Sequence, residues 1–183
     1  MMMEASEYYN RGLFSFNNGD YADAIEDWTS AIQLNPNYVL AYNKRAWAYD
    51  KTGEADKAID DWEAVLRISP AHSAAGKSLK GACLARGTAR YNKEDYDGAI
   101  ADFSRAIELD PKEDYHGAED FIPIIGLDQY NAIAYYNRGC VYSNIGDYDH
   151  AIADWEAALK IDPNNADIKA DIEKAKEARN GKQ

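Results

Sequence analysis

Residues 12–36 read GLFSFNNGDYADAIEDWTSAIQLNP, and the pattern of small and aromatic residues in this stretch returns three more times along the chain. The landmarks of the first copy are Gly12, Tyr21, Ala24, Trp28 and Pro36. The later copies carry, in the same order, Ala46, Ala55, Ala58, Trp62 and Pro70; Gly87, Tyr96, Ala99, Phe103 and Pro111; and Gly139, Tyr148, Ala151, Trp155 and Pro163. The first two prolines lie 34 residues apart, which is the period of a repeat built from one pair of helices.

Each landmark has a physical reason within such a helix pair. The small residue of the first helix lets the second helix approach closely at its alanine. The aromatic residue four positions after that alanine is the large wedge of the core. Gly19, Gly53 and Gly146 can take the left-handed conformation that ends a helix. Asp20, Asp95 and Asp147 then stand where a carboxylate can cap the second helix, and the proline stops that helix.

In spacing and residue types the chain resembles the tetratricopeptide repeat family, with repeats at 5–38, 39–72, 80–113 and 132–165. The resemblance implies an all-α fold, an α-solenoid in which four helix-turn-helix repeats form a right-handed superhelix. We expect one domain over residues 1–183, stabilised by contacts between neighbouring repeats. A final helix over 166–180, with Ile168, Ile172 and Ala175 on one face, is predicted to cap the solenoid; a partner-binding tail is the alternative.

Two segments depart from the repeat. Seven extra residues, Ser73 to Leu79, come close to two helical turns and predict one long helix from Ser73 to Tyr91. The third repeat also departs from the family pattern, because Cys83 and Arg90 replace large apolar residues and Glu94 replaces glycine.

The second departure is the insertion at 114–131, which reads DYHGAEDFIPIIGLDQYN. Its five large apolar side chains favour an ordered segment, because burying them offsets the entropy of ordering. Pro123 and Gly126 argue against one continuous helix. We expect Phe121 and Ile124 to be buried against the chain's own repeats; contact with another chain is the alternative.

Charge and hydropathy narrow the choice of partners. The net charge of −12, with no basic stripe, argues against nucleic acid and would attract a basic peptide. No apolar run approaches the ~20 residues that span a membrane. The charged N-terminus does not resemble a signal segment, so a cytoplasmic location is expected. Cys83 and Cys140 are expected to be reduced packing residues.

The sequence shows no catalytic constellation. His72, His116 and His150 lack ligand spacing with one another or with the cysteines, so we predict neither a metal site nor a cofactor. There is no glycine-rich phosphate loop, nucleophile elbow or HExxH pair. We therefore expect a protein that is not an enzyme.

The family resemblance implies a concave groove lined by the first helix of each repeat. The residues that it places there are Tyr9, Asn10, Leu13, Asn17, Asn43, Lys44, Trp47, Lys51, Leu84, Thr88, Tyr91, Tyr136, Asn137 and Cys140. Asparagine amides can both donate to and accept from an extended peptide backbone. Relatives that dock heat-shock chaperone tails hold the terminal carboxylate with lysine, asparagine and arginine. The matching positions here are Tyr9, Leu13, Lys44, Gly81 and Ala85, so docking of such tails is disfavoured.

Three hypotheses remain, of which the third, an enzyme, would need a site assembled from residues distant in sequence. The first is a module that binds a peptide or partner protein in the groove. The second is an assembly subunit that forms a homo-oligomer through the insertion or a convex face.

Overall fold

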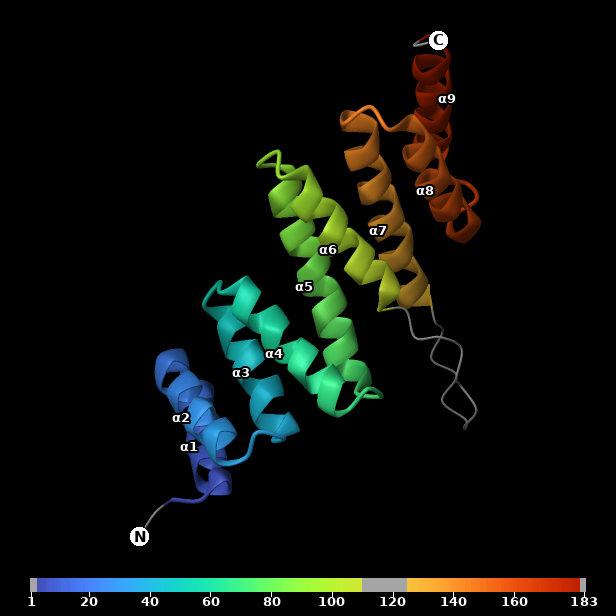
Figure 1. Cartoon of the computed structure of the whole chain (residues 1–183). Coiled ribbons are helices and arrows are strands. Elements are labelled where there is room, and N and C mark those ends of the chain that lie inside the picture. Colours follow the sequence, from blue (N-terminus) through green and yellow to red (C-terminus); the bar gives the residue numbers. More distant parts are fainter. Residues whose placement is uncertain (1–2, 110–124, 182–183) are drawn as a thin grey trace, which may run out of the picture. The chain divides into compact units, whose positions relative to one another are not determined.

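The computed structural model describes residues 3–109 and 125–181, which are helical with short turns and contain no strand. Figure 1 shows these helices as pairs joined by tight turns. The pairs are α1 (Ala5–Asn18) with α2 (Tyr21–Leu34), α3 (Val39–Lys51) with α4 (Ala55–Ile68), α5 (Ser73–Tyr91) with α6 (Tyr96–Glu108), and α7 (Ile125–Asn144) with α8 (Tyr148–Ile161); the final helix is α9 (Ala166–Asn180). The predicted all-α solenoid of helix pairs with a C-terminal helix is confirmed.

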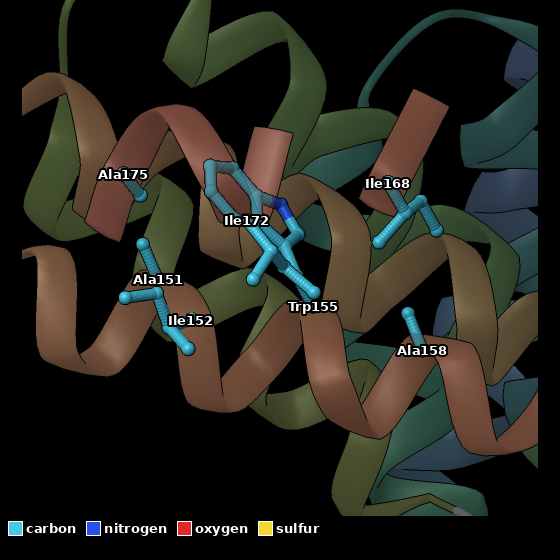
Figure 2. Packing of buried hydrophobic residues seen from close by; sticks show 7 residues of the cluster. All are labelled: Ala151, Ile152, Trp155, Ala158, Ile168, Ile172 and Ala175. Carbon is cyan, nitrogen blue, oxygen red and sulfur yellow. The ribbon is translucent and has the colours of Figure 1, made fainter. Parts of the chain in front are cut away.

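The chain folds as two compact units, Met1–Ala82 and Cys83–Gln183, and α5 contributes to both. In unit 1 the core joins α2 to α3 through Ala24, Trp28, Ala31, Ile32 and Ala41. In unit 2 a corresponding cluster joins α8 to α9. Figure 2 shows the labelled side chains of this cluster, Ala151, Ile152, Trp155 and Ala158 from α8 facing Ile168, Ile172 and Ala175 from α9. The predicted apolar stripe of the last helix therefore packs on the helix before it.

The first helix of each pair ends in the same hydrogen-bonded turn. Gly19, Gly53 and Gly146 have φ of 88°, 80° and 82°, so the predicted left-handed conformation is confirmed at all three. Glu94 takes the same place after α5 with φ of 63°. Its amide donates to the Tyr91 carbonyl at 2.9 Å, and the following amide donates to the Arg90 carbonyl at 3.0 Å. The turn therefore forms without glycine, at the cost of a strained backbone.

Two of the three predicted aspartate caps are confirmed. Asp95 accepts a hydrogen bond from the Gly98 amide at 3.1 Å, and Asp147 accepts one from the His150 amide at 3.3 Å. The prediction for Asp20 is wrong, because its side chain accepts no capping bond at the start of α2. A second carboxylate in the first turn does not account for the difference, since the helices that begin after Asp95 and Asp147 also carry an aspartate there.

The small residue of each first helix lies directly under the aromatic wedge of the second. A Cβ built on Gly139 would lie 2.6 Å from Trp155 Nε1, and one on Gly12 would lie 2.7 Å from Trp28 Nε1. These close approaches let Trp28 and Trp155 donate to the carbonyls of Tyr9 and Tyr136, each at 3.2 Å. In the second pair Ala46 replaces glycine, and Trp62 Nε1 is buried without a hydrogen-bond partner. The missing hydrogen bond therefore coincides with the one pair in which the small residue carries a methyl group.

An arginine–aspartate pair joins the two helices of every repeat, which the sequence analysis did not predict. The four pairs are Arg11–Asp27, Arg45–Asp61, Arg86–Asp102 and Arg138–Asp154. Each arginine immediately precedes the small residue, and each aspartate, buried, immediately precedes the aromatic wedge. Two pairs also reach the preceding helix, since Arg45 donates to Thr29 Oγ1 and Arg138 to Ser104 Oγ, each at 2.8 Å. The register of the third repeat is therefore the same as that of the others.

The two departures from the repeat have different outcomes. The predicted long helix is confirmed, since α5 runs from Ser73 to Tyr91. Residues 125–131 of the insertion belong to α7, which begins at Ile125, includes Gly126 and continues to Asn144. The expectation that the insertion is not one continuous helix also concerns residues 114–124, which lie outside the described residues. Pro123 precedes the helix and the glycine falls in its first turn, where neither interrupts helical hydrogen bonds. The predictions for Phe121 and Ile124 lie outside the described residues, as does Pro111.

Candidate functional site

In unit 1 the first half of the predicted binding surface lies on α1. Asn10 and Asn17 are exposed, whereas Tyr9 and Leu13 are half-buried and pack against the α2–α3 core. The Tyr9 ring lies 5.2 Å from the Tyr38 ring between centroids, and burial raises the pKa of its hydroxyl. These two residues therefore contribute to the core as well as to the surface.

The second half lies on α3, where Asn43 and Trp47 occupy successive turns. Asn43 Oδ1 is buried and has no hydrogen-bond partner among the described residues. Trp47 keeps 38% of its surface exposed and packs edge-on against Trp62, with ring centroids 5.6 Å apart. Lys44 is half-buried and Lys51 is exposed. This face thus combines an unpaired acceptor, an anchored but accessible indole and two amines.

In unit 2 the predicted residues of α5 differ in accessibility. Leu84 is buried, and Thr88 is exposed with its hydroxyl donating to the Leu84 carbonyl at 2.9 Å. Tyr91 is half-buried, and its hydroxyl accepts a 2.6 Å hydrogen bond from Asn144 Nδ2 at the end of α7. Leu84 therefore reaches no ligand without rearrangement, while Thr88 and Tyr91 remain at the surface.

The residues predicted on α7 are brought together with α9. Tyr136, Asn137 and Cys140 are all half-buried, and the Tyr136 hydroxyl lies 3.4 Å from Asp171 Oδ2. Burial raises the pKa of both Tyr136 and the Cys140 thiol. A thiol kept neutral in this way is a poor nucleophile, so the cluster is suited to contact rather than catalysis.

A cavity of about 680 Å³ opens beside this cluster, between α7, the α8–α9 turn and the start of α9. Its lining includes the apolar side chains of Ile133, Ile161 and Ile168, the Tyr136 ring, and two carboxylates, Asp162 and Asp167. The volume falls in the range of small-molecule and peptide sites. Among the residues that line it in the described part of the chain there is no lysine, arginine or histidine.

Residues 3–109 and 125–181 contain no group of three or more His, Cys, Asp or Glu that could hold a metal ion. Both cysteines are free thiols. In the same part of the chain no helix combines the length and hydropathy needed to cross a bilayer.

Residues that complete these surfaces were not predicted from the sequence. Asp171 and Asn144 bind predicted residues from other helices, and the cavity depends on the α8–α9 turn. The arginine–aspartate pairs did carry a signal: an Arg before each small residue and an Asp before each aromatic, always 16 positions apart. No equivalent pattern marks the cavity, because its residues come from three elements and occur once.

Repeated helix pairs with accessible polar and aromatic side chains on their first helices define a helical-repeat protein of the protein-interaction class. Models of the tetratricopeptide repeat match residues 5–38, 28–60, 81–113 and 132–165. The chain belongs to this family.

Among curated proteins, the chain is similar to rat (Rattus norvegicus) serine/threonine-protein phosphatase 5, with 24% identity over 92% of this chain and 22% of the relative. It is also similar to Hsp70-Hsp90 organizing protein 3 of Arabidopsis thaliana, with 31% identity over 59% of this chain and 18% of the relative. The chain thus spans about a fifth of the length of these relatives. A solved structure of MamA protein matches with a TM-score of 0.54 and 23% identity, covering 96% of this chain and 82% of that one, and supports the fold alone.

Proposed function

We propose that the chain is a non-catalytic protein-interaction module that binds an extended segment of a partner protein along the first helices of its repeats. The observation that carries this proposal is the α3 face in unit 1, where Asn43 Oδ1 lacks a hydrogen-bond partner beside the exposed Trp47. A buried acceptor without a partner costs about 1–3 kcal/mol, and a side-chain rotation toward a peptide N–H would recover that loss.

Trp47 supplies the anchoring surface beside this acceptor. Its edge-on contact with the buried Trp62 holds the indole in one orientation while 38% of it remains accessible. A rigid, amphipathic ring loses little conformational entropy on binding, and tryptophan is enriched among the residues that dominate interface energies. In unit 2, Asn137 stands at the position equivalent to Lys44, so an amide is available on α7 as well.

The chaperone tail remains a disfavoured ligand in this proposal, although one relative is named as an Hsp70-Hsp90 organizing protein. A carboxylate clamp needs cationic donors on the first helices. Of the five matching positions only Lys44 carries a charge, while the others are Tyr9, Leu13, Gly81 and Ala85. The phosphatase activity in the name of the rat relative, serine/threonine-protein phosphatase 5, is likewise not proposed for this chain, because the chain spans only 22% of that protein.

The test is affinity capture with the intact chain, followed by calorimetric titration of an identified partner. Asn43→Ala and Asn137→Ala should each weaken binding about two- to tenfold, the equivalent of one backbone contact worth ~0.5–1.5 kcal/mol. Asn164→Ala, an exposed asparagine in the α8–α9 turn, is the matched control and should leave affinity unchanged. Melting temperatures should be nearly unchanged in Asn137→Ala and Asn164→Ala, and Asn43→Ala, which removes the unpaired buried acceptor, should not melt below the native chain. Unchanged affinity in both surface variants would move the binding site away from the first helices.

The assembly alternative predicts a different solution behaviour. Light scattering over a dilution series would show a persistent dimer if the chain were an assembly subunit, and a monomer if it were a binding module alone. The described residues contain no observation that favours assembly over binding.

A further inference from the structure

The cavity between α7 and α9 in unit 2 has a chemistry that none of the relatives' names assigns. It combines three apolar side chains, Ile133, Ile161 and Ile168, with the ring of Tyr136 and the carboxylates of Asp162 and Asp167. Ile133 keeps 41% of its surface exposed, so its side chain is accessible to a ligand in the cavity. The cavity therefore offers apolar contact and negative charge together.

Among the described residues, no cationic side chain neutralises the two carboxylates. Asp171, just outside the cavity, forms an ion pair with Lys174 at 3.1 Å and lies close to the Tyr136 hydroxyl. Neither Asp162 nor Asp167 forms an ion pair with a described residue; Asp162 accepts only a 3.1 Å hydrogen bond from the neutral Asn165 amide. A cation entering the cavity would meet two carboxylates and no competing positive side chain.

The chain already shows which cation fits such surroundings. In the second pair Arg45 donates to both oxygens of Asp61, at 2.8 and 2.7 Å, and its guanidinium lies 5.6 Å from the Tyr42 ring centroid. Arg138 repeats this arrangement with Asp154 and Tyr135. The cavity presents the aspartate and tyrosine of this combination without the arginine.

We infer that the cavity is the receptor for an arginine side chain of an extended partner peptide, which deepens the proposed function and rests on it. The guanidinium contacts Asp162 and Asp167 in a charge-assisted fork and lies on the face of Tyr136. The aliphatic stem and a neighbouring apolar residue of the peptide pack on Ile133, Ile161 and Ile168. A lysine binds less well, because its ammonium is strongly hydrated and cannot form the fork. The cavity volume of about 680 Å³ accommodates a short peptide segment rather than one side chain alone.

The test uses the synthetic peptide acetyl-Gly-Leu-Arg-Leu-Gly-amide and the same peptide with citrulline, which keeps the shape of arginine without its charge. Binding is followed through the NMR signals of isoleucine methyl groups in the intact chain. The arginine peptide should shift the signals of Ile133, Ile161 and Ile168, with at least about fivefold higher affinity than the citrulline peptide. Raising the salt concentration should narrow this difference.

The double variant Asp162→Asn/Asp167→Asn should lower affinity for the arginine peptide about three- to tenfold. Its matched control is Glu156→Gln/Glu177→Gln, which removes the same charge from exposed positions of α8 and α9 outside the cavity and should change affinity less than twofold. Equal binding of the two peptides, an unaffected double aspartate variant, or shifts confined to other isoleucines would each overturn the inference. Methyl shifts that depend on protein concentration without peptide would assign the cavity to a second copy of the chain instead.

The same variants distinguish a failure of the arginine receptor from a failure of the proposed function. A captured partner whose binding depends on Asn43 but not on Asp162 and Asp167 would leave the interaction module standing and refute the arginine receptor. A partner that is insensitive to both sets of variants would refute the proposed function itself.

Discussion

Replacing Gly139 by alanine tests the central packing feature of the helix pairs. The Cβ of alanine would lie 2.6 Å from Nε1 and 2.7 Å from Cδ1 of Trp155, which is 3% exposed and has no free space to enter. The ring must move, and in moving it loses the 3.2 Å hydrogen bond to the Tyr136 carbonyl. The second pair shows the result in the native chain, since Ala46 coincides there with an unpaired Trp62 Nε1.

The expected change in the free energy of unfolding of Gly139→Ala follows from two opposing effects. Alanine stabilises a helix interior by about 0.5–1 kcal/mol relative to glycine. Overpacking, or the buried indole N–H left unpaired when the ring moves, costs about 1–3 kcal/mol. These two costs are not added together, because a shift of the Trp155 ring relieves the overlap with the new Cβ and, by the same movement, breaks the hydrogen bond to the Tyr136 carbonyl. Gly139→Ala should therefore lower the free energy of unfolding by about 1–2 kcal/mol.

The assay is urea denaturation, with the indole N–H signals of the four tryptophans as local probes. In Gly139→Ala the signal of Trp155 should lose its protection from hydrogen exchange. Gly81→Ala is the matched control, because a Cβ on Gly81 in α5 meets no atom within 4 Å and should stabilise by up to about 1 kcal/mol. If Gly139→Ala gained stability like the control, with the Trp155 indole still protected, the close approach would not depend on glycine.

Three other experiments test a turn, an ion pair and the burial of a cysteine. Glu94→Gly should stabilise by about 0.5–1 kcal/mol, because it relieves a φ of 63°, and a urea midpoint that fails to rise would exclude strain at this turn. Arg138→Met should cost about 3–5 kcal/mol by leaving the carboxylate of Asp154 buried without its partner; the double variant Arg138→Met/Asp154→Leu should recover much of this loss in the same melts. Because burial raises the pKa of Cys140, less thiolate is present at a given pH than in the unfolded chain; alkylation at pH 8 should be slow and should accelerate as pH rises, whereas rapid reaction would contradict the burial.

Features that depend on residues close in sequence were predicted well. The left-handed turns at Gly19, Gly53 and Gly146 and the limits of the helix over 73–91 follow from local preferences. Asp20 shows the limit of that reasoning, since an aspartate at the capping position does not by itself form the cap: its side chain accepts no capping hydrogen bond. The start of α7 within the insertion was not predicted, although a glycine such as Gly126 is tolerated in the first turn of a helix.

Features that depend on two helices in register were only partly predicted. The aromatic wedges were assigned from the period of the repeat. Their hydrogen bonds to the Tyr9 and Tyr136 carbonyls could not be predicted, because they depend on how closely each ring approaches the backbone of the first helix. The arginine–aspartate pairs need the same knowledge of register. The cavity beside Tyr136 is harder still, because its shape depends on how the α8–α9 turn places Asp162 and Asp167 beside α7.

The same contacts between the two helices recur in all four pairs, while the residues at other equivalent positions change from pair to pair. The arginine–aspartate bond and the small residue under the aromatic wedge fix each helix pair in one geometry. The residues at other equivalent positions vary: one position carries in turn Tyr9, Asn43, Leu84 and Tyr136, and another carries Leu13, Trp47, Thr88 and Cys140. A repeat protein can vary such positions, because much of its stability comes from contacts that recur in every repeat. The second pair is the informative exception, since its wedge lacks the indole hydrogen bond where the surface carries an exposed tryptophan. Two buried polar atoms without a described partner, Trp62 Nε1 and Asn43 Oδ1, therefore occur in the same helix pair as the exposed Trp47, so this pair is the first place to test for binding.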